Sequence, residues 1–199
     1  MSLPLKLIVG IGNPGEQYAR TRHNVGVWLV SRFADQQGVT FSKEKKFFGR
    51  TATTVFDGHE IRLLLPDTYM NESGKSVAAL VNFFKVDPEE ILVVHDELDL
   101  DTGLIRFKQG GGLAGHNGLR SITQRLGGTQ DYNRLRIGVG HPGDKSDVTG
   151  HVLGKVSKRD EVVINECIEE ALRVFPTAIS GDWENAMNQL NGLRIEPAE

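Results

Sequence analysis

The chain has 199 residues, of which 39% are hydrophobic and 25% charged, so its length and composition fit one ordinary globular domain and exclude a disordered or collagen-like chain. Its single cysteine, Cys167, excludes an internal disulfide and a cysteine-rich zinc site, and no apolar run is long enough for a signal peptide or a membrane span. We therefore expect a single domain, residues 1–199, in the cytoplasm.

The formal net charge of −3 hides an uneven distribution of charge along the chain. Between Lys108 and Lys145, six basic residues stand against two acidic ones, a local net charge of +4. Over residues 157–199, nine acidic residues outnumber four basic ones, a local net charge of −5. This asymmetry allows a local site for a polyanion on an acidic protein. The alternative is that both segments only form solvated faces of the fold.

The first half of the chain predicts a strand, a helix and a hairpin. Residues 6–12 form a short, β-branched apolar run that ends in a Gly-Asn-Pro-Gly turn, which is typical of a buried strand. Residues 24–37 have apolar side chains at helical spacing and stop at a glycine, which predicts a crossover helix. Residues 47–56 and 59–65 are joined by Asp57-Gly58, a strong signal for a β-hairpin.

The middle of the chain predicts helices that alternate with strands. Residues 71–85 carry apolar side chains at helical spacing, and residues 91–94 are typical of a buried strand. Two further strands are predicted over residues 104–108 and 134–139. Between them, a triple glycine is followed by a predicted helix from about residue 118 to residue 126.

Two more helices are expected at the end of the chain, over residues 157–174 and 177–190. Strands that alternate with helices, together with one hairpin, favour an α/β fold with a mixed, mostly parallel sheet flanked by helices on both faces. Ligands of such sheets bind at the carboxyl ends of the strands, where loops converge. Polar clusters follow three predicted strands, at residues 13–23, 69–71 and 95–97, and we expect them to meet there.

The segment from Gly10 to Gly15 matches the Gly-x-Gly-x-x-Gly pattern of dinucleotide-binding loops. That function requires a helix N-terminus at the loop, facing the pyrophosphate. Here the apolar period of the helix begins only at Val27, and Asp35, the acid at the expected distance, falls inside that helix. Dinucleotide binding is therefore the weaker alternative for this loop.

His23 precedes the first predicted helix, and Asp96 follows a predicted buried strand. Alone, each has an ordinary explanation, as a helix-start or surface histidine and as a carboxylate that caps a turn. Together they form a candidate general base and its orienting carboxylate, because a neutral imidazole, with an ordinary pKa of about 6.5, can accept a proton from water.

Three asparagines lie near the ends of predicted elements. Asn13 is typical of a turn, and Asn71 and Asn117 are typical N-caps of helices. Their amides are equally suited to hold a carbonyl substrate and an attacking water. Cys167 lies on an amphipathic helix without a histidine nearby, so we interpret it as a packing residue and not as a nucleophile.

Five blocks of the sequence carry a resemblance to a known family. They are GIGNPG with TRHN (within residues 10–24), PDTYMNESG (66–74), VHDELDL (94–100), GHNGLR (115–120) and RLRIGVGHPG (134–143). In order and spacing they resemble the bacterial peptidyl-tRNA hydrolases, closely over residues 5–155 and more loosely beyond. One departure is Leu113-Ala114, where the family commonly has His-Gly, and it concerns the shape of the loop over the cleft.

The resemblance implies an enzyme that hydrolyses the ester between an N-blocked peptide and the 3′-terminal ribose of tRNA. It implies no metal, no cofactor and no covalent intermediate. His23 would be the general base that activates water, and Asp96 would fix its tautomer and stabilise the imidazolium. Asn13 would contact the acylated backbone of the last residue and reject a free, charged α-amino group.

The remaining residues implied by the resemblance bind substrate. Asn71 and Asn117 would hold the substrate carbonyl, the terminal adenosine or the water, while Tyr18 and Tyr69 would line the site of the 3′ end.

Lys108 and Arg136 fit the family's basic contacts to the acceptor-stem backbone and the 5′ phosphate of tRNA. Such contacts position a nucleic acid without reading its sequence. The implied partner is therefore peptidyl-tRNA, bound by a monomer, with no membrane or DNA partner. A domain that keeps the RNA-binding surface without turnover is the non-enzymatic alternative.

Overall fold

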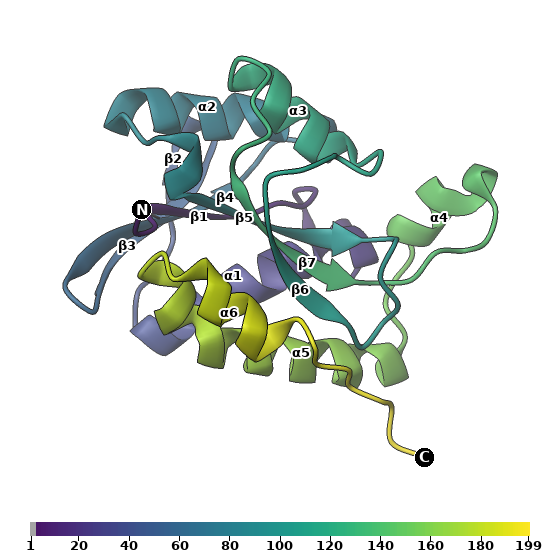
Figure 1. The fold of residues 1–199 in the computed structure, drawn as a ribbon. Helices are drawn as coiled ribbons and strands as arrows, with labels where there is room; N and C mark the ends of the chain where they lie inside the picture. Colours follow the sequence, from purple (N-terminus) through teal and green to yellow (C-terminus); the bar gives the residue numbers. More distant parts are fainter. Residues whose placement is uncertain (1–2) are drawn as a thin grey trace.

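The computed structural model of the protein describes residues 3–199, and a seven-stranded sheet forms its centre (Figure 1). The strands are β1 (Leu7–Gly10), β2 (Ser42–Glu44), β3 (Gly49–Phe56), β4 (His59–Pro66), β5 (Ile91–Glu97), β6 (Ile105–Gln109) and β7 (Asn133–Gly138). Their order across the sheet is β2-β3-β4-β1-β5-β7-β6. The central strands β4, β1, β5 and β7 run parallel, while β2, β3 and β6 pair antiparallel at the two sides.

Helices cover both faces of the sheet (Figure 1). The α-helices are α1 (Val25–Gln37), α2 (Ser73–Phe84), α3 (Asn117–Arg125), α4 (Val148–Val152), α5 (Lys158–Ile179) and α6 (Trp183–Leu190). Helices α2 and α3 lie on one face and α1, α5 and α6 on the other, while the short α4 projects beyond the strand ends. Within residues 3–199, no helix is both long enough and apolar enough to cross a bilayer.

Two apolar cores result from this layering. Successive residues of a strand point to opposite faces, so Leu7 and Val9 of β1 belong to the core under α2 and α3, whereas Ile8 belongs to the core under α1, α5 and α6. Cys167 is part of the second core, and burial raises the pKa of its thiol to about 12. Its position therefore agrees with a packing role.

The α/β fold class predicted from the sequence is confirmed, and so is the hairpin, in which Phe56 of β3 pairs with His59 of β4. The last helix, predicted over residues 177–190, is present and ends at Leu190, but its predicted start is wrong. Helix α5 continues through Pro176 to Ile179, and α6 begins only at Trp183. Burial of Phe175, Ala178 and Ile179 in the core compensates for the backbone hydrogen bond that the proline removes.

Further corrections concern the ends of elements. Strand β5 extends past residue 94 to Glu97, and all three additional residues are buried in a strand between β1 and β7. Strand β2 and helix α4 are not predicted from the sequence, because both are short and mostly polar. The extension of β5 matters most, since it places Asp96 inside the sheet and not in a turn.

Gly10, the first glycine of the dinucleotide-like pattern, and Gly26 of α1 allow the backbones of strand and helix to approach each other. A Cβ on Gly26 of α1 would lie 2.2 Å from the carbonyl oxygen of Val94, and one on Gly10 would lie 2.7 Å from that of Gly26. Only a one-turn 3-10 helix, η1 (Glu16–Tyr18), follows this loop directly, and helix α1 begins at Val25, ten positions beyond Gly15. The loop therefore lacks the long helix at its end that the dinucleotide-binding alternative requires.

We expect Gly26→Ala to destabilise the fold by about 3 kcal/mol, because the added methyl group overlaps the β5 backbone. Denaturant unfolding of this variant and of wild type measures the difference. Gly192→Ala is the matched control, since no atom lies within 4 Å of its added Cβ, and its stability should match wild type. Equal stability of all three proteins would contradict the close contact of α1 with β5.

Candidate active site

A cleft of about 230 Å³ lies at the carboxyl ends of β4, β1 and β5, three neighbouring parallel strands. The loop after each strand, or the strand end itself, contributes a polar side chain to it, as expected for a parallel sheet. Apolar side chains that line it include those of Leu98, Val152 and Leu153. The polar residues that line it are Asn13, His23, Tyr69, Asn71, Asp96, Glu97, His116, Asn117 and Thr149.

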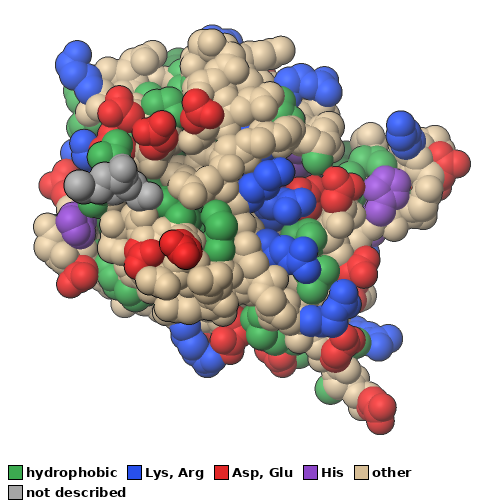
Figure 2. All heavy atoms as spheres, in the orientation of Figure 1, with side chains coloured by type: hydrophobic (Ala, Val, Ile, Leu, Met, Phe, Trp, Pro, Cys, Tyr) green, Lys and Arg blue, Asp and Glu red, His purple; other side chains and the backbone are tan. Residues whose placement is uncertain are grey.

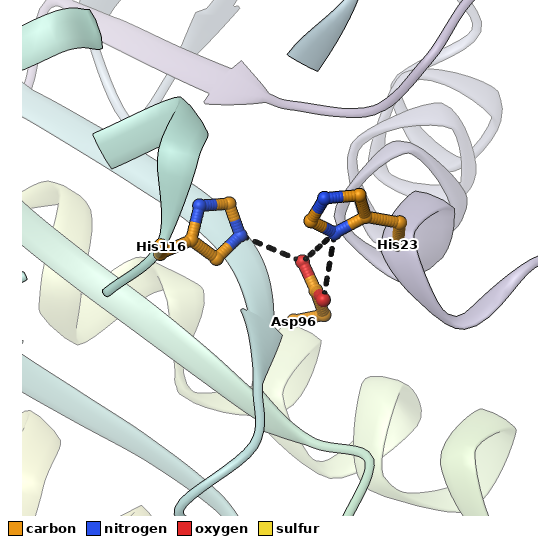
Figure 3. Close-up of side chains that lie close together, drawn as sticks. All are labelled: His23, Asp96 and His116. Atoms are coloured by element: carbon orange, nitrogen blue, oxygen red, sulfur yellow. Dashed lines mark hydrogen bonds and ion pairs between the residues drawn. The ribbon is translucent and has the colours of Figure 1, made fainter. Parts of the chain in front are cut away.

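The Asp96 carboxylate lies between two imidazoles (Figure 3). His23 Nδ1 is 2.8 Å from Asp96 Oδ2 and 2.9 Å from Oδ1, and His116 Nε2 is 2.8 Å from Oδ1. Asp96 is 1% exposed, and the side chains of His23 and His116 are 11% and 8% exposed. Three elements far apart in the sequence therefore meet at one buried carboxylate.

Hydrogen bonds determine which imidazole nitrogens carry protons. His116 Nδ1 accepts from the backbone N–H groups of Gly118 and Leu119, so its proton is on Nε2 and is donated to Asp96. His116, and not Asn117, is thus the N-cap of α3, so the interpretation of Asn117 as an N-cap is wrong. Asn117 is the first helical residue and is exposed, so its amide is free to face the cleft.

Asp96 is held in its ionised form. Burial by itself would raise the pKa of this carboxyl, but the electrostatic attraction of His23 and His116 and the hydrogen bonds from both imidazoles outweigh it, and the pKa lies well below its ordinary value. The carboxylate therefore accepts a hydrogen bond from His23 Nδ1, which leaves Nε2 of that ring as the nitrogen with a free lone pair.

The donor atoms of His23, Asp96 and His116 lie within 4.8 Å of one another, a spacing that also suits a metal ion. The tautomer of His116 argues against such a site. A neutral imidazole has one lone pair, and that of His116 caps α3, so its Nε2 faces Asp96 with a proton. A metal would have to break the cap, and we conclude that this cluster does not fit a metal.

Asn13 is fixed by its neighbours. Its side-chain Oδ1 accepts a 2.7 Å hydrogen bond from the backbone N–H of Met70, so the amide NH₂ is the end left for a ligand in the cleft. Asn71 follows Met70 in a 3-10 helix, η4 (Met70–Glu72). The N-cap of α2 is Glu72, so the interpretation of Asn71 as an N-cap is wrong. Both asparagines therefore line the cleft.

Of the two tyrosines predicted to bind the 3′ end, Tyr69 lines the cleft, and Tyr18 contacts Tyr69 without lining it. The rings of Tyr18 and Tyr69 meet edge to face with centroids 6.4 Å apart, and Tyr69 is 56% exposed and lines the cleft. Exposed aromatic faces of this kind suit the stacking of nucleic acid bases.

Lys108 and Arg136 lie in a second, smaller pocket of about 130 Å³, which shares Glu97 and Ala114 with the cleft. Basic side chains gather over β6 and β7 on the face seen in Figure 2, with acidic ones beside them. Arg136 Nε makes a 2.8 Å ion pair with Glu97, whereas no ion pair of Lys108 occurs within residues 3–199. The sequence did not predict this partial neutralisation of Arg136.

Comparison with known proteins gives the same family along the whole chain. A family profile described as peptidyl-tRNA hydrolase matches residues 7–198. A peptidyl-tRNA hydrolase of Alcanivorax borkumensis is 54% identical over 194 residues, which is 98% of this chain and all of the relative, and one of Psychromonas ingrahamii is 50% identical over 98% of this chain and all of the relative. The crystal structure of peptidyl-tRNA hydrolase from Acinetobacter baumannii superposes with a TM-score of 0.94 at 46% identity, over 98% of each chain.

The chain belongs to the peptidyl-tRNA hydrolase family. This family cleaves the ester that joins peptide to tRNA, so the resemblance and the hydrolase function predicted from the sequence are confirmed.

The loop of this hydrolase that has Leu113-Ala114 in place of His-Gly is held against the rest of the fold. Leu113 packs on the core under α2 and α3, Ala114 adopts a left-handed φ of 50°, and the buried Arg134 donates to the carbonyl oxygens of Gly111 and Gly112.

His116 is the main residue of this site that sequence reasoning missed as a functional candidate. It occurs in the GHNGLR block, but a predicted helix that begins after Asn117 gives His116 no role. Histidine is not among the favoured N-cap residues, so the local sequence carries no signal for this cap.

His95 is a second buried histidine beside the site. Its Nδ1 donates to the carbonyl oxygen of Asp96, and its Nε2 is buried without a hydrogen-bond partner among residues 3–199. Burial, reinforced by the nearby His116, lowers the pKa of His95 to about 3. The native protein therefore keeps this imidazole neutral where the unfolded chain protonates it.

This shift predicts a pH-dependent loss of stability. Between about pH 6 and pH 4, the unfolded state binds a proton at His95 that the native state does not bind. As the pH is lowered through this range, this group should therefore reduce the free energy of unfolding by about 1.4 kcal/mol per pH unit. His95→Asn keeps a donor for Asp96 but cannot be protonated, so its free energy of unfolding should fall less steeply than that of wild type. Parallel curves from denaturant unfolding at several pH values would contradict the prediction.

Proposed function

We propose that His23 is the general base of this hydrolase and that Asp96 is its orienting carboxylate. The observation that carries the proposal is the contact of His23 Nδ1 with a buried, ionised Asp96, which leaves the lone pair of Nε2 for a water in the cleft. The water oxygen attacks the ester carbonyl carbon while its proton moves to Nε2. The bond to the ribose oxygen then breaks, and the imidazolium returns the proton to that oxygen.

Asp96 contributes to this step through its charge. The imidazolium forms at 2.8 Å from a carboxylate that stays ionised, so the positive charge is stabilised as it develops. His116 holds the other side of the same carboxylate and is itself held by the α3 backbone. We infer that His116 keeps Asp96 from turning away from His23.

Asn13 is placed to select N-blocked substrates. With Oδ1 occupied by Met70, its amide presents N–H donors, which match the carbonyl oxygen of an N-acyl group. A free α-ammonium group carries only donors and a positive charge, so it finds no acceptor there. We propose that this contact separates peptidyl-tRNA from aminoacyl-tRNA.

The other predicted residues receive the two ends of the substrate. We propose that Asn71 and Asn117 hold the ester carbonyl, the terminal adenosine or the water, and that Tyr18 and Tyr69 line the 3′ end. Lys108 and Arg136 take the acceptor-stem backbone and the 5′ phosphate in the neighbouring pocket. One chain supplies all of these groups, so we propose that the protein acts as a monomer with a single domain, residues 1–199. We also propose that it acts in the cytoplasm.

The direct experiment compares N-acetylated with free aminoacyl-tRNA as substrates and measures release of the acyl group. We expect rapid hydrolysis of the acetylated form and little of the free form. Hydrolysis of neither substrate, with tRNA binding intact, would instead support an RNA-binding domain without turnover.

Two variants test the catalytic pair. His23→Ala should lower kcat by about 10²–10⁴-fold because the base is lost, and Asp96→Asn should lower it by up to about 10⁴-fold because an amide cannot stabilise the imidazolium. Binding of uncharged tRNA, measured by fluorescence anisotropy, should stay near wild type for both. The double variant should be little worse than the poorer single variant, since the two act as one unit. Near wild-type kcat of His23→Ala would overturn the assignment.

A further pair of variants tests the tRNA pocket. Lys108→Ala and Arg136→Ala should impair hydrolysis of full peptidyl-tRNA more than that of an N-acetylaminoacyl-adenosine ester, which lacks phosphates. Lys108→Ala should have the larger effect, because Glu97 already neutralises part of the charge of Arg136. The salt dependence of tRNA affinity should fall by about 1–2 units of slope in the double variant. An unchanged slope would place the tRNA on another face.

A further inference from the structure

Asn24 directly follows the proposed base, His23, in the chain, but its side chain does not cap the helix that begins there. It occupies the N-cap of α1, where asparagine ordinarily bonds a backbone N–H of the first turn. Its carboxamide makes no such bond and is instead 4% exposed and turned toward the loop that carries Asn13. Another function of this side chain must account for the lost cap.

The carboxamide of Asn24 pairs with the backbone of Asn13 at both ends. Asn24 Oδ1 accepts from the Asn13 N–H at 2.9 Å, and Asn24 Nδ2 donates to the Asn13 carbonyl at 2.9 Å. Since each end of the amide meets the complementary backbone group, the orientation of Asn24 is determined. The pair links the 3-10 turn η2 (Arg22–Asn24), which carries His23, directly to Asn13.

Gly12 makes this approach possible. A Cβ at position 12 would lie 2.8 Å from Cγ and Oδ1 of Asn24 and 2.8 Å from Cγ2 of Val27. Gly12 thus leaves the space that the Asn24 carboxamide and the Val27 side chain fill, which explains the second glycine of the loop without any bound nucleotide.

We propose that Asn24 is a positioning residue that fixes the amide of Asn13 relative to His23 and so sets the preference for N-acylated substrates. The proposal rests on the proposed role of Asn13. Asn13 is then held at three points, its N–H and carbonyl by Asn24 and its Oδ1 by Met70. Its NH₂ group makes no hydrogen bond among residues 3–199, and the residue that holds its backbone, Asn24, is adjacent to the proposed base in the chain.

Loss of this clamp, the two hydrogen bonds between the Asn24 carboxamide and the Asn13 backbone, should affect the selection of substrate more than the rate of the chemical step. In Asn24→Ala, the Asn13 loop loses two hydrogen bonds, and its amide no longer meets the N-acyl carbonyl in one geometry. We expect kcat/KM for N-acetylaminoacyl-tRNA to fall about tenfold, mainly through KM, while that for free aminoacyl-tRNA changes little. Asn24→Asp keeps the acceptor for the Asn13 N–H but sets an oxygen against its carbonyl, so it should be impaired as well.

The experiment measures kcat and KM of wild type, Asn24→Ala, Asn13→Ala and the double variant on both substrates, with melting temperatures to confirm folding. If Asn24 acts through the Asn13 amide, the two losses of selectivity should not add in the double variant. Gly12→Ala, whose added Cβ overlaps Asn24 and Val27, should give at least the same loss of selectivity.

Two results would overturn the inference. One is unchanged selectivity in Asn24→Ala, and the other is an equal loss on both substrates that adds fully to that of Asn13→Ala, which indicates a role in stability alone. Failure of wild type to prefer the acetylated substrate would instead refute the proposed role of Asn13, so the two failures are distinguishable.

Discussion

The buried carboxylate of Asp96 is the constraint on which the rest of the site depends. A carboxylate at 1% exposure is stable only with hydrogen-bond donors around it, and His23 and His116 supply them from two separate elements. Removing either donor leaves charge uncompensated in the core. The same requirement that keeps the fold stable therefore orients the proposed base, so that stability and catalysis use one interaction.

Asp96 and the two histidines that donate to it are held by the main chain of strands and helices. Asp96 lies within β5, between two parallel strands, and His116 is tied to the first turn of α3 by two backbone N–H groups. His23 belongs to a turn that α1 continues, and Gly26 brings α1 against β5 at backbone contact distance. The proposed base and its partner are thus aligned by packing of main chain, which moves less than a pair of surface side chains would.

The sequence predicted most of the fold and most of the proposed site, for physical reasons that also explain its failures. Apolar periodicity and the Asp57-Gly58 turn predicted every strand except β2, the hairpin and α1 to within a few residues. Pro176 misled the prediction because core burial outweighs one lost hydrogen bond. The role of His116 was missed because local pattern favours asparagine as a cap, whereas the choice of cap depends on Asp96, twenty residues away. The clamp of Asn24 on Asn13 is equally a contact between loops that no local pattern encodes.

The arrangement of the two pockets bears on how a protein with a net charge of −3 would select a polyanion. The pocket with Lys108 also contains Glu97 and Asp99, and Glu97 already pairs with Arg136. Such a pocket holds few free positive charges, so counterion release alone gives weak binding to RNA in general. On the proposed assignment, a substrate gains affinity only when its phosphates and its N-acylated 3′ end engage both pockets together, through the shared wall of Glu97 and Ala114. Free tRNA lacks the acyl group and aminoacyl-tRNA lacks the acceptor for Asn13, so each engages only part of the surface and leaves it readily.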